Sequence, residues 1–150
     1  MKNRLVIVTD LGCLRAYRQE DAAPDRGPRL ELVEEFTPEN AHARISDIMA
    51  DSAGRFPRGG GAQNVSGDMS SGERNDLERE HRRRLIKQVG ARLDALLGDE
   101  AVRTCLFAAG SEINAQLINE LSPRARGKIT GNVTGNFVKA GKAELLQRFF

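Results

Sequence analysis

The chain has few of the residues that mark secreted, membrane-spanning or metal-binding proteins. It contains two cysteines, one tyrosine and no tryptophan. Cys13 and Cys105 form no CxxC pair and have no histidine at metal-ligand spacing, which favours small buried thiols over redox or nucleophilic groups. The longest apolar runs, such as residues 5–8, are far too short to span a membrane. We therefore expect no membrane span, no metal site and no cofactor.

The chain also has little excess of positive over negative charge. The chain carries 23 lysine or arginine residues and 21 aspartate or glutamate residues, for a net charge of +2. Any contact with nucleic acid must therefore rest on a local basic patch. The first residues run directly into a strand-like segment, without the apolar core and cleavage site of a signal peptide, which predicts a cytoplasmic protein.

The chain does have enough apolar residues for one core, and a long polar segment interrupts them. Hydrophobic residues make up 39% and charged residues 29%, which is typical of a soluble globular domain. Residues 50–72 are rich in glycine and poor in apolar side chains. Such a segment has too little hydrophobic surface to offset the entropy of ordering it, so it is either functional or disordered. We predict a single domain over residues 1–150 with a long Gly-rich loop at about 50–72.

Two strands are predicted at the start of the chain. Residues 4–9 form a continuous apolar, β-branched run that is typical of a buried central strand. Residues 13–19 alternate between apolar and polar side chains, which predicts a second strand with one solvated face that carries Arg15, Tyr17 and Arg18. A turn-rich linker with two prolines follows.

A third strand is predicted at residues 29–37, where the pattern alternates again. A regular strand places Leu30, Leu32 and Glu34 on one face and Val33 on the other. Together with the first two strands it makes an antiparallel meander.

The clearest predicted helix follows the Gly-rich loop. Ser70 and Glu73 form a capping box at its start, and Gly98 ends it. Its apolar stripe consists of Leu77, His81, Leu85, Val89, Leu93, Leu96 and Leu97. On this stripe His81 is better interpreted as a partly buried core residue than as a metal ligand.

The rest of the chain predicts two more strands and two more helices. The strands are at residues 101–108 and 128–133. A helix between them has Ser111 as its N-cap and is stopped by Pro123, and a last helix covers residues 136–150.

The resulting element order is βββαβαβα. Strands four and five are each reached through a helix, so both should lie parallel to the first strand. We predict an α/β fold in three layers with a five-stranded mixed sheet. This is the element order of ribonuclease-H-like and related folds.

Several features of the sequence together resemble one bacterial family. They are Thr9-Asp10-Leu11-Gly12 at the end of the first strand, Asp51-Ser52-Ala53-Gly54-Arg55 before the Gly-rich loop, the long helix, the strand end at residues 106–110, and Pro123-Arg124 before the last strand. The chain resembles the bacterial host-attachment proteins, a family described as required for attachment to host cells. That family is itself similar to the middle domain of archaeal and eukaryotic peptide-chain release factors.

The release-factor similarity directs attention to the Gly-rich loop. In release factors a Gly-Gly-Gln tripeptide places a glutamine where peptidyl-tRNA is hydrolysed. Here Ala62 interrupts the corresponding residues, which favours a Gly-rich linker over a hydrolytic role for Gln63. The loop candidates are Arg55, Gly59, Gly60, Gly61 and Gln63.

A metal-dependent nuclease of ribonuclease-H-like fold is a further alternative. Such an enzyme gathers about four carboxylates around two divalent cations. Asp10 lies at the end of the first strand, and Glu73, Asp76 and Glu80 lie on the long helix. The strand at residues 101–108 supplies no carboxylate, so the set is incomplete.

Basic residues form the candidate nucleic-acid surface. Arg79, Arg83 and Lys87 share one face of the long helix, and cations of this kind attract phosphate backbones such as those of rRNA or tRNA. Further candidates are Arg58, Arg124, Arg126 and Lys128. The alternative is a solvated face with i,i+4 pairs such as Glu78–Arg82 and Glu80–Arg84.

From the sequence and the resemblance, we expect a non-enzymatic module associated with RNA or the ribosome. Its partner would be the ribosome, tRNA or rRNA, and we expect no membrane partner. The competing hypotheses are a hydrolase that uses Gln63 or Asp10, and a protein-interaction module without an RNA partner.

Overall fold

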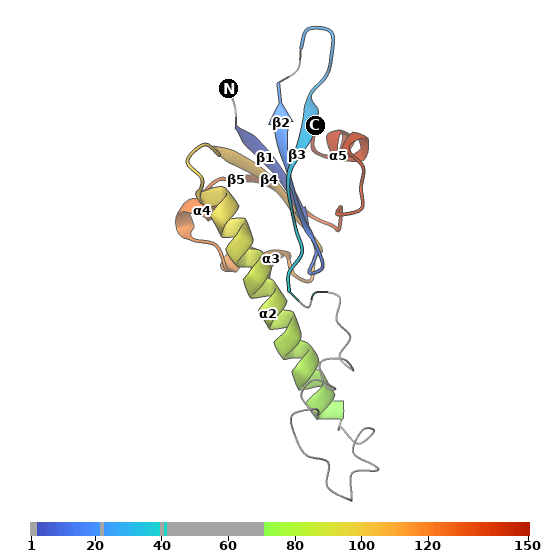
Figure 1. The fold of residues 1–150 in the computed structure, drawn as a ribbon, viewed down its shortest axis with the longest axis vertical. Coiled ribbons are helices and arrows are strands. Elements are labelled where there is room, and N and C mark those ends of the chain that lie inside the picture. Colours follow the sequence, from blue (N-terminus) through green and yellow to red (C-terminus); the bar gives the residue numbers. More distant parts are fainter. Residues whose placement is uncertain (1–2, 22, 40, 42–70) are drawn as a thin grey trace, which may run out of the picture.

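The fold is built on a five-stranded sheet with helices on both faces (Figure 1). The computed structural model describes residues 3–21, 23–39, 41 and 71–150. Its elements are β1 (Arg4–Thr9), β2 (Leu14–Glu20), β3 (Arg29–Phe36), α2 (Ser71–Gly98), β4 (Thr104–Ala109), α3 (Asn114–Asn119), α4 (Pro123–Gly127), β5 (Ile129–Thr134) and α5 (Lys142–Phe149). The α/β fold with a five-stranded mixed sheet is therefore confirmed.

The strands lie in the order β3-β2-β1-β4-β5. β1 pairs antiparallel with β2, and β2 pairs antiparallel with β3. β4 lies parallel to β1 on its other side, and β5 lies parallel to β4. The meander and the two parallel strands reached through helices are thus as the sequence predicts.

β1 occupies the centre of the sheet because its side chains are apolar on both faces. Leu5 and Ile7 belong to one core cluster, together with side chains from α2, α3 and α4. Val6 and Val8 belong to a second cluster, together with Leu145 of α5. A strand with two apolar faces must be covered on both, and this requirement gives the molecule its three layers.

The predicted solvated face of β2 is wrong. Tyr17 is only 4% exposed and packs in the cluster beneath α5. Arg15, on the same face, donates a hydrogen bond from Nη1 to the backbone oxygen of Val138 at 2.7 Å. The last helix and the segment before it cover this face, and the alternation within β2 carries no sign of them.

A β-bulge in β3 corrects the predicted position of Glu34. Tyr17 pairs with Leu32 and Ala16 with Glu34, so Val33 is the extra residue on β3. The bulge moves Glu34 from the face of Leu32 to the opposite face, where Arg92 of α2 meets it. A strict two-residue period does not predict such an insertion.

The helix that follows β4 differs from the prediction at both ends. Residues 111–113 form a turn, and α3 begins at Asn114 with Ile113, not Ser111, as its N-cap. The prediction that Pro123 stops this helix is wrong, because α3 ends at Asn119 and Pro123 opens the additional helix α4. The hydroxyl of Ser122 accepts a hydrogen bond from the backbone N–H of Ala125 at 3.2 Å, and proline is favoured at the first helical position.

The last helix starts later than predicted, at Lys142 instead of residue 136. Asn136 uses its side chain in a turn, where its Oδ1 accepts the backbone N–H of Val138 at 3.1 Å. Asparagine commonly competes with helix formation in this way.

Ser70 of the capping box predicted for α2 lies outside the described residues.

α2 is much longer than the core it covers. Leu85, Ile86, Val89, Leu93 and Leu97 are buried, and all lie in its second half. Residues 72–76 are exposed, and Leu77 and His81 are only half-buried. The first half of the helix extends beyond the end of the sheet (Figure 1). The apolar stripe predicted from Leu77 onwards therefore reaches the core only from Leu85.

α2 and α3 approach closely at a glycine. A Cβ atom added to Gly90 would lie 2.7 Å from the Cβ of Glu120, just past the end of α3. A side chain at position 90 would therefore push the two helices apart.

Leucine truncation separates the two halves of α2. We expect Leu93→Ala to lower the free energy of unfolding by about 2–5 kcal/mol, because the side chain is fully buried and leaves a cavity. We expect Leu77→Ala to cost less than about 1 kcal/mol, because Leu77 lies outside the main core. Urea unfolding followed by circular dichroism measures both, and equal losses would contradict this division of the helix.

Candidate functional site

The candidate residues of the segment at about 50–72 cannot be placed in a site. Arg55, Arg58, Gly59, Gly60, Gly61 and Gln63 all lie outside the described residues. The candidate surfaces are therefore built from residues 3–41 and 71–150, with the gaps given above.

Arg79, Arg83 and Lys87 lie together on the outer side of α2, and we call them the α2 basic face. All three are exposed. They follow one another at intervals of four residues, so their Cα atoms are about 6 Å apart along the helix axis. Arg83 also contacts Glu80, with 3.3 Å between Nε and Oε2. The sequence prediction that these cations share one face agrees with the helix geometry.

The neighbouring arginines of α2 are held by carboxylates. Nε of Arg84 lies 3.4 Å from Oε1 of Glu80. This i,i+4 pair is one that the solvated-face alternative predicts. Arg82 does not pair with Glu78. Its guanidinium donates to the backbone oxygen of Glu112 at 3.2 Å and lies 3.8 Å from the Glu112 carboxylate. Arg82 thus ties α2 to the turn before α3 and is less available to a ligand.

The second basic group lies at the other end of α2. Arg124 and Arg126 are exposed on α4, and Lys128 follows that helix. Lys128 donates from Nζ to the backbone oxygens of Leu97, at 2.5 Å, and Asp99, at 2.9 Å. Eighteen residues of helix separate Arg79 from Leu97, a rise of about 27 Å. The structure therefore does not gather all predicted cations into one patch.

Lys128 caps the carboxyl end of α2. The last carbonyls of a helix lack partners within it and carry partial negative charge, so an ammonium group there is stabilising. This position gives Lys128 a structural role that its place in the sequence does not reveal.

Asp10, the acidic residue of the nuclease alternative, is engaged by hydrogen bonds. Its Oδ1 accepts the backbone N–H groups of Gly12 and Cys13, both at 2.8 Å. Its Oδ2 accepts Nδ2 of Asn136 at 3.2 Å. The carboxylate thereby closes the turn between β1 and β2 and links it to the segment before α5. Within the described ranges, no three His, Cys, Asp or Glu side chains lie close enough together to hold a metal ion.

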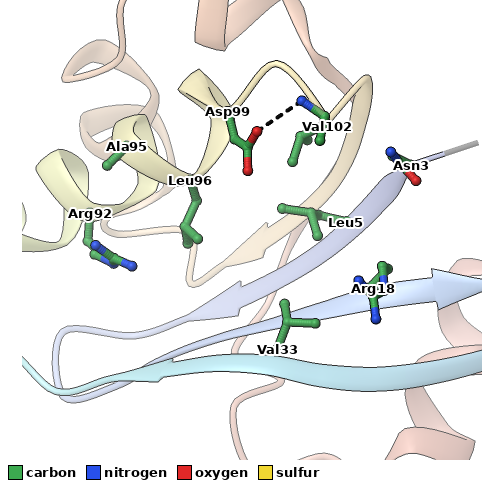
Figure 2. Close-up of a pocket in the computed structure, with 10 residues that line it drawn as sticks. Asn3, Leu5, Arg18, Val33, Arg92, Ala95, Leu96, Asp99 and Val102 are labelled. Atoms are coloured by element: carbon green, nitrogen blue, oxygen red, sulfur yellow. Dashed lines mark hydrogen bonds between the residues drawn. The ribbon is translucent and has the colours of Figure 1, made fainter.

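Sequence reasoning did not identify the hollow shown in Figure 2. It has a volume of about 350 Å³ and lies between the end of α2, β3 and the start of β1. Leu5, Val33, Leu96 and Val102 supply most of its apolar surface. Val33 is 43% exposed and lines this hollow from β3.

Charged residues stand at the rim of the same hollow. Arg92 donates from Nε to Oε2 of Glu34 at 2.6 Å, and Arg18 is paired with Glu31. Asp99 accepts the backbone N–H of Ala101 at 2.9 Å. The described residues that line the hollow include no serine, cysteine or histidine, and its apolar side chains offer a place for an apolar group. The sequence alone does not reveal this hollow, because it forms only where β3 packs beside α2.

The two cysteines differ in their access to solvent. Cys105 lies in the core of β4, and burial raises the pKa of its thiol to about 12. Cys13 is half-buried at the end of the β1–β2 turn, and its pKa is raised, first by burial and then by the nearby Glu35 carboxylate. The prediction of a small buried thiol is confirmed for Cys105, whereas Cys13 is only half-buried.

The comparisons with known proteins identify a family. The sequence model of the family described as "Protein required for attachment to host cells" matches residues 5–149. A search of curated proteins found no match to the chain. Among the helices within the described ranges, none is both long and apolar enough to cross a membrane.

Lys128 and Arg124 give a matched test of structural and surface cations. We expect Lys128→Ala to lower the free energy of unfolding by about 1–2 kcal/mol, because the carbonyls of Leu97 and Asp99 lose a charged donor. We expect Arg124→Ala to change it by less than about 0.5 kcal/mol, since its side chain is exposed. Chemical unfolding of the two variants measures both changes. Equal losses of unfolding free energy would contradict the capping role of Lys128.

Thiol labelling tests the difference between the cysteines. At mildly alkaline pH we expect a thiolate-specific reagent to modify Cys13 slowly and Cys105 only after unfolding, so Cys13→Ser should abolish labelling of the folded protein. The neutral Cys105 thiol stabilises the fold fully below its ordinary pKa of 9.0, and this contribution is lost as the pH rises towards about 12. Rapid labelling of Cys105 in the folded protein would contradict its burial.

Proposed function

Because the chain belongs to the family of proteins required for attachment to host cells, we propose that it is a non-enzymatic binding protein whose α2 basic face contacts the phosphate backbone of RNA. Family membership indicates an attachment-related function. The family description names a biological outcome and leaves the molecular contact open. We propose that this molecular contact is with RNA and that the ribosome is the principal partner.

The observation that carries this proposal is the extension of α2 beyond the sheet. Only its second half covers the core, so the fold itself needs no more than about half of this helix. Between residues 73 and 87 the helix has six arginine or lysine residues and four acidic ones. Arg79, Arg83 and Lys87 are exposed there, and the first and last form no ion pair with any residue that the structure describes. A solvent-exposed row of cations is the electrostatic requirement for binding a phosphate backbone.

The α2 basic face suits backbone contact better than recognition of bases. Arginine can bind a phosphate through two parallel N–H groups, and lysine acts as a mobile point charge. Single-stranded RNA is usually read by aromatic side chains that stack on its bases, and aromatic residues make up only 5% of this chain. We therefore propose structured RNA, whose shape and phosphates can be contacted without base stacking, as the ligand.

The arrangement of the sheet supports a finer fold assignment. We propose that the domain is ribonuclease-H-like and related to the middle domain of release factors. The support is the element order together with the strand order β3-β2-β1-β4-β5, in which β2 is the antiparallel neighbour of β1. A ribosomal partner would place the protein in the cytoplasm.

Charge reversal on the α2 basic face tests the proposal. We expect the tagged wild-type protein to co-sediment with ribosomes and to bind a fluorescent structured RNA with an affinity that falls steeply between about 50 and 200 mM salt. We expect Arg83→Glu/Lys87→Glu to weaken RNA binding by about tenfold or more at low salt and to reduce the salt dependence. The fold should be unchanged, because both side chains are exposed.

The matched control is Arg103→Glu/Lys139→Glu, which makes the same change in net charge at two exposed cations outside α2. This control should bind within about twofold of the wild type, since only local charges count within a Debye length. Equal losses in the two double variants would show a nonspecific charge effect and contradict the proposal. Absence of ribosome co-sedimentation at low salt would also contradict it.

Gln63→Ala separates binding from hydrolysis. We expect this variant to bind RNA like the wild type. Release of the peptide from peptidyl-tRNA by the wild type, abolished in Gln63→Ala, would establish the hydrolase alternative instead.

A further inference from the structure

A cleft with cationic and apolar walls lies on the face of the sheet opposite α2. It has a volume of about 700 Å³ and is formed by the β2–β3 hairpin and the first part of α5. These two elements lie beside each other at the β3 edge of the sheet (Figure 1). We call it the hairpin cleft.

Three cations line the hairpin cleft and come from three segments of the chain. Arg26 is in the hairpin, Arg29 begins β3, and Lys142 begins α5. All three are exposed, and within the described ranges none of them forms an ion pair. They differ in this respect from the arginines of β2, which are paired with glutamates of β3.

The acidic residues of the lining neutralise these cations only in part. Glu31 is occupied by Arg18 of β2. Glu20 lies opposite Arg29 in the β2–β3 register and compensates that residue in part. Arg26 and Lys142 therefore remain as uncompensated positive charges, so the lining favours an anion.

The wall between the cations is apolar. Leu30 is 6% exposed and belongs to the cluster beneath α5, and Leu146 packs against that cluster from α5. Both line the hairpin cleft, with the ring of Pro28 beside them. A bare inorganic anion would satisfy the charges and leave this apolar wall exposed to water. A ligand that carries an anionic group on an apolar body would use both features.

We infer that the hairpin cleft binds a small organic anion, whose carboxylate, sulfonate or phosphate group lies between Arg26 and Lys142 and whose apolar body packs on Leu30 and Leu146. The site is on the opposite face of the sheet from the α2 basic face and is independent of RNA binding. Exposed guanidinium and ammonium groups lose little solvation before the ligand arrives, so the affinity is modest and dependent on salt.

Anilinonaphthalene sulfonate tests this inference, because it joins an anionic sulfonate to an aromatic body. We expect it to bind the folded protein with a fluorescence increase, and to shift amide resonances of residues 26–31 and 142–146. We expect Arg26→Glu/Lys142→Glu to weaken binding by about tenfold or more, since two attractive charges become repulsive. The uncharged analogue N-phenylnaphthylamine should bind the wild type more weakly and respond little to the same variant.

Arg103→Glu/Lys139→Glu is the matched control, because it makes the same change in net charge at two exposed cations that do not line the cleft. It should retain binding within about twofold. Thermal melts of the variants should match the wild type, because each changed side chain is exposed.

Three results would overturn the inference. One is undiminished sulfonate binding in Arg26→Glu/Lys142→Glu. Another is a set of shifted resonances around Leu5, Val33 and Leu96, which would locate the probe in the hollow of Figure 2 instead. The third is binding to phosphatidylglycerol vesicles, lost in the double variant, without binding of the soluble probe, which would assign the cations to a membrane surface.

Discussion

Burial of β1 on both faces is the constraint on which the rest of the structure depends. Leu5, Val6, Ile7 and Val8 are all at most 6% exposed, and they alternate between two separate core clusters. Such a strand is stable only if helices cover both sides and strands pair with both edges. β2 supplies one edge through a short turn that Asp10 closes, and β4 supplies the other after the long helix α2. The three layers follow from this one apolar run.

The same constraint divides the surfaces available for function. α2, α3 and α4 cover one face, and α2 continues past the sheet as a charged helix with little contact to the core. α5 and the β2–β3 hairpin meet on the other face and leave a cleft whose cations form no ion pair with the residues that the structure describes. Charges that stabilise the fold are held by partners, as Lys128 is at the end of α2 and Arg92 is by Glu34. Arg79, Lys87, Arg26 and Lys142 form no ion pair within the described ranges, and they lie on the two surfaces to which we assign ligands.

Local patterns identified most elements, and they failed where a distant segment changed the environment. The apolar run of β1, the length of α2 and the parallel placement of β4 and β5 were predictable from periodicity and order. The burial of Tyr17 was not, because α5 covers it from more than a hundred residues away in sequence. The bulge in β3 depends on one inserted residue, Val33. The late start of α5 depends on the turn formed by Asn136. Neither feature changes the hydrophobic period of the sequence enough to be predicted from it.

The sequence by itself determined the class of fold, the central strand, the long basic helix and the family resemblance, because these depend on composition, periodicity and motif order along the chain. Only the tertiary structure decided which charges are free to bind. Arg79, Arg83 and Lys87 share one face of α2, as helical spacing requires. In contrast, Lys128 caps the end of α2 and Asp10 closes a turn, so both are engaged within the fold. The hairpin cleft likewise joins Arg26 to Lys142, which are far apart in sequence. A charged side chain becomes a site or a structural support according to its neighbours in space, and those neighbours are set by packing on the two faces of the sheet.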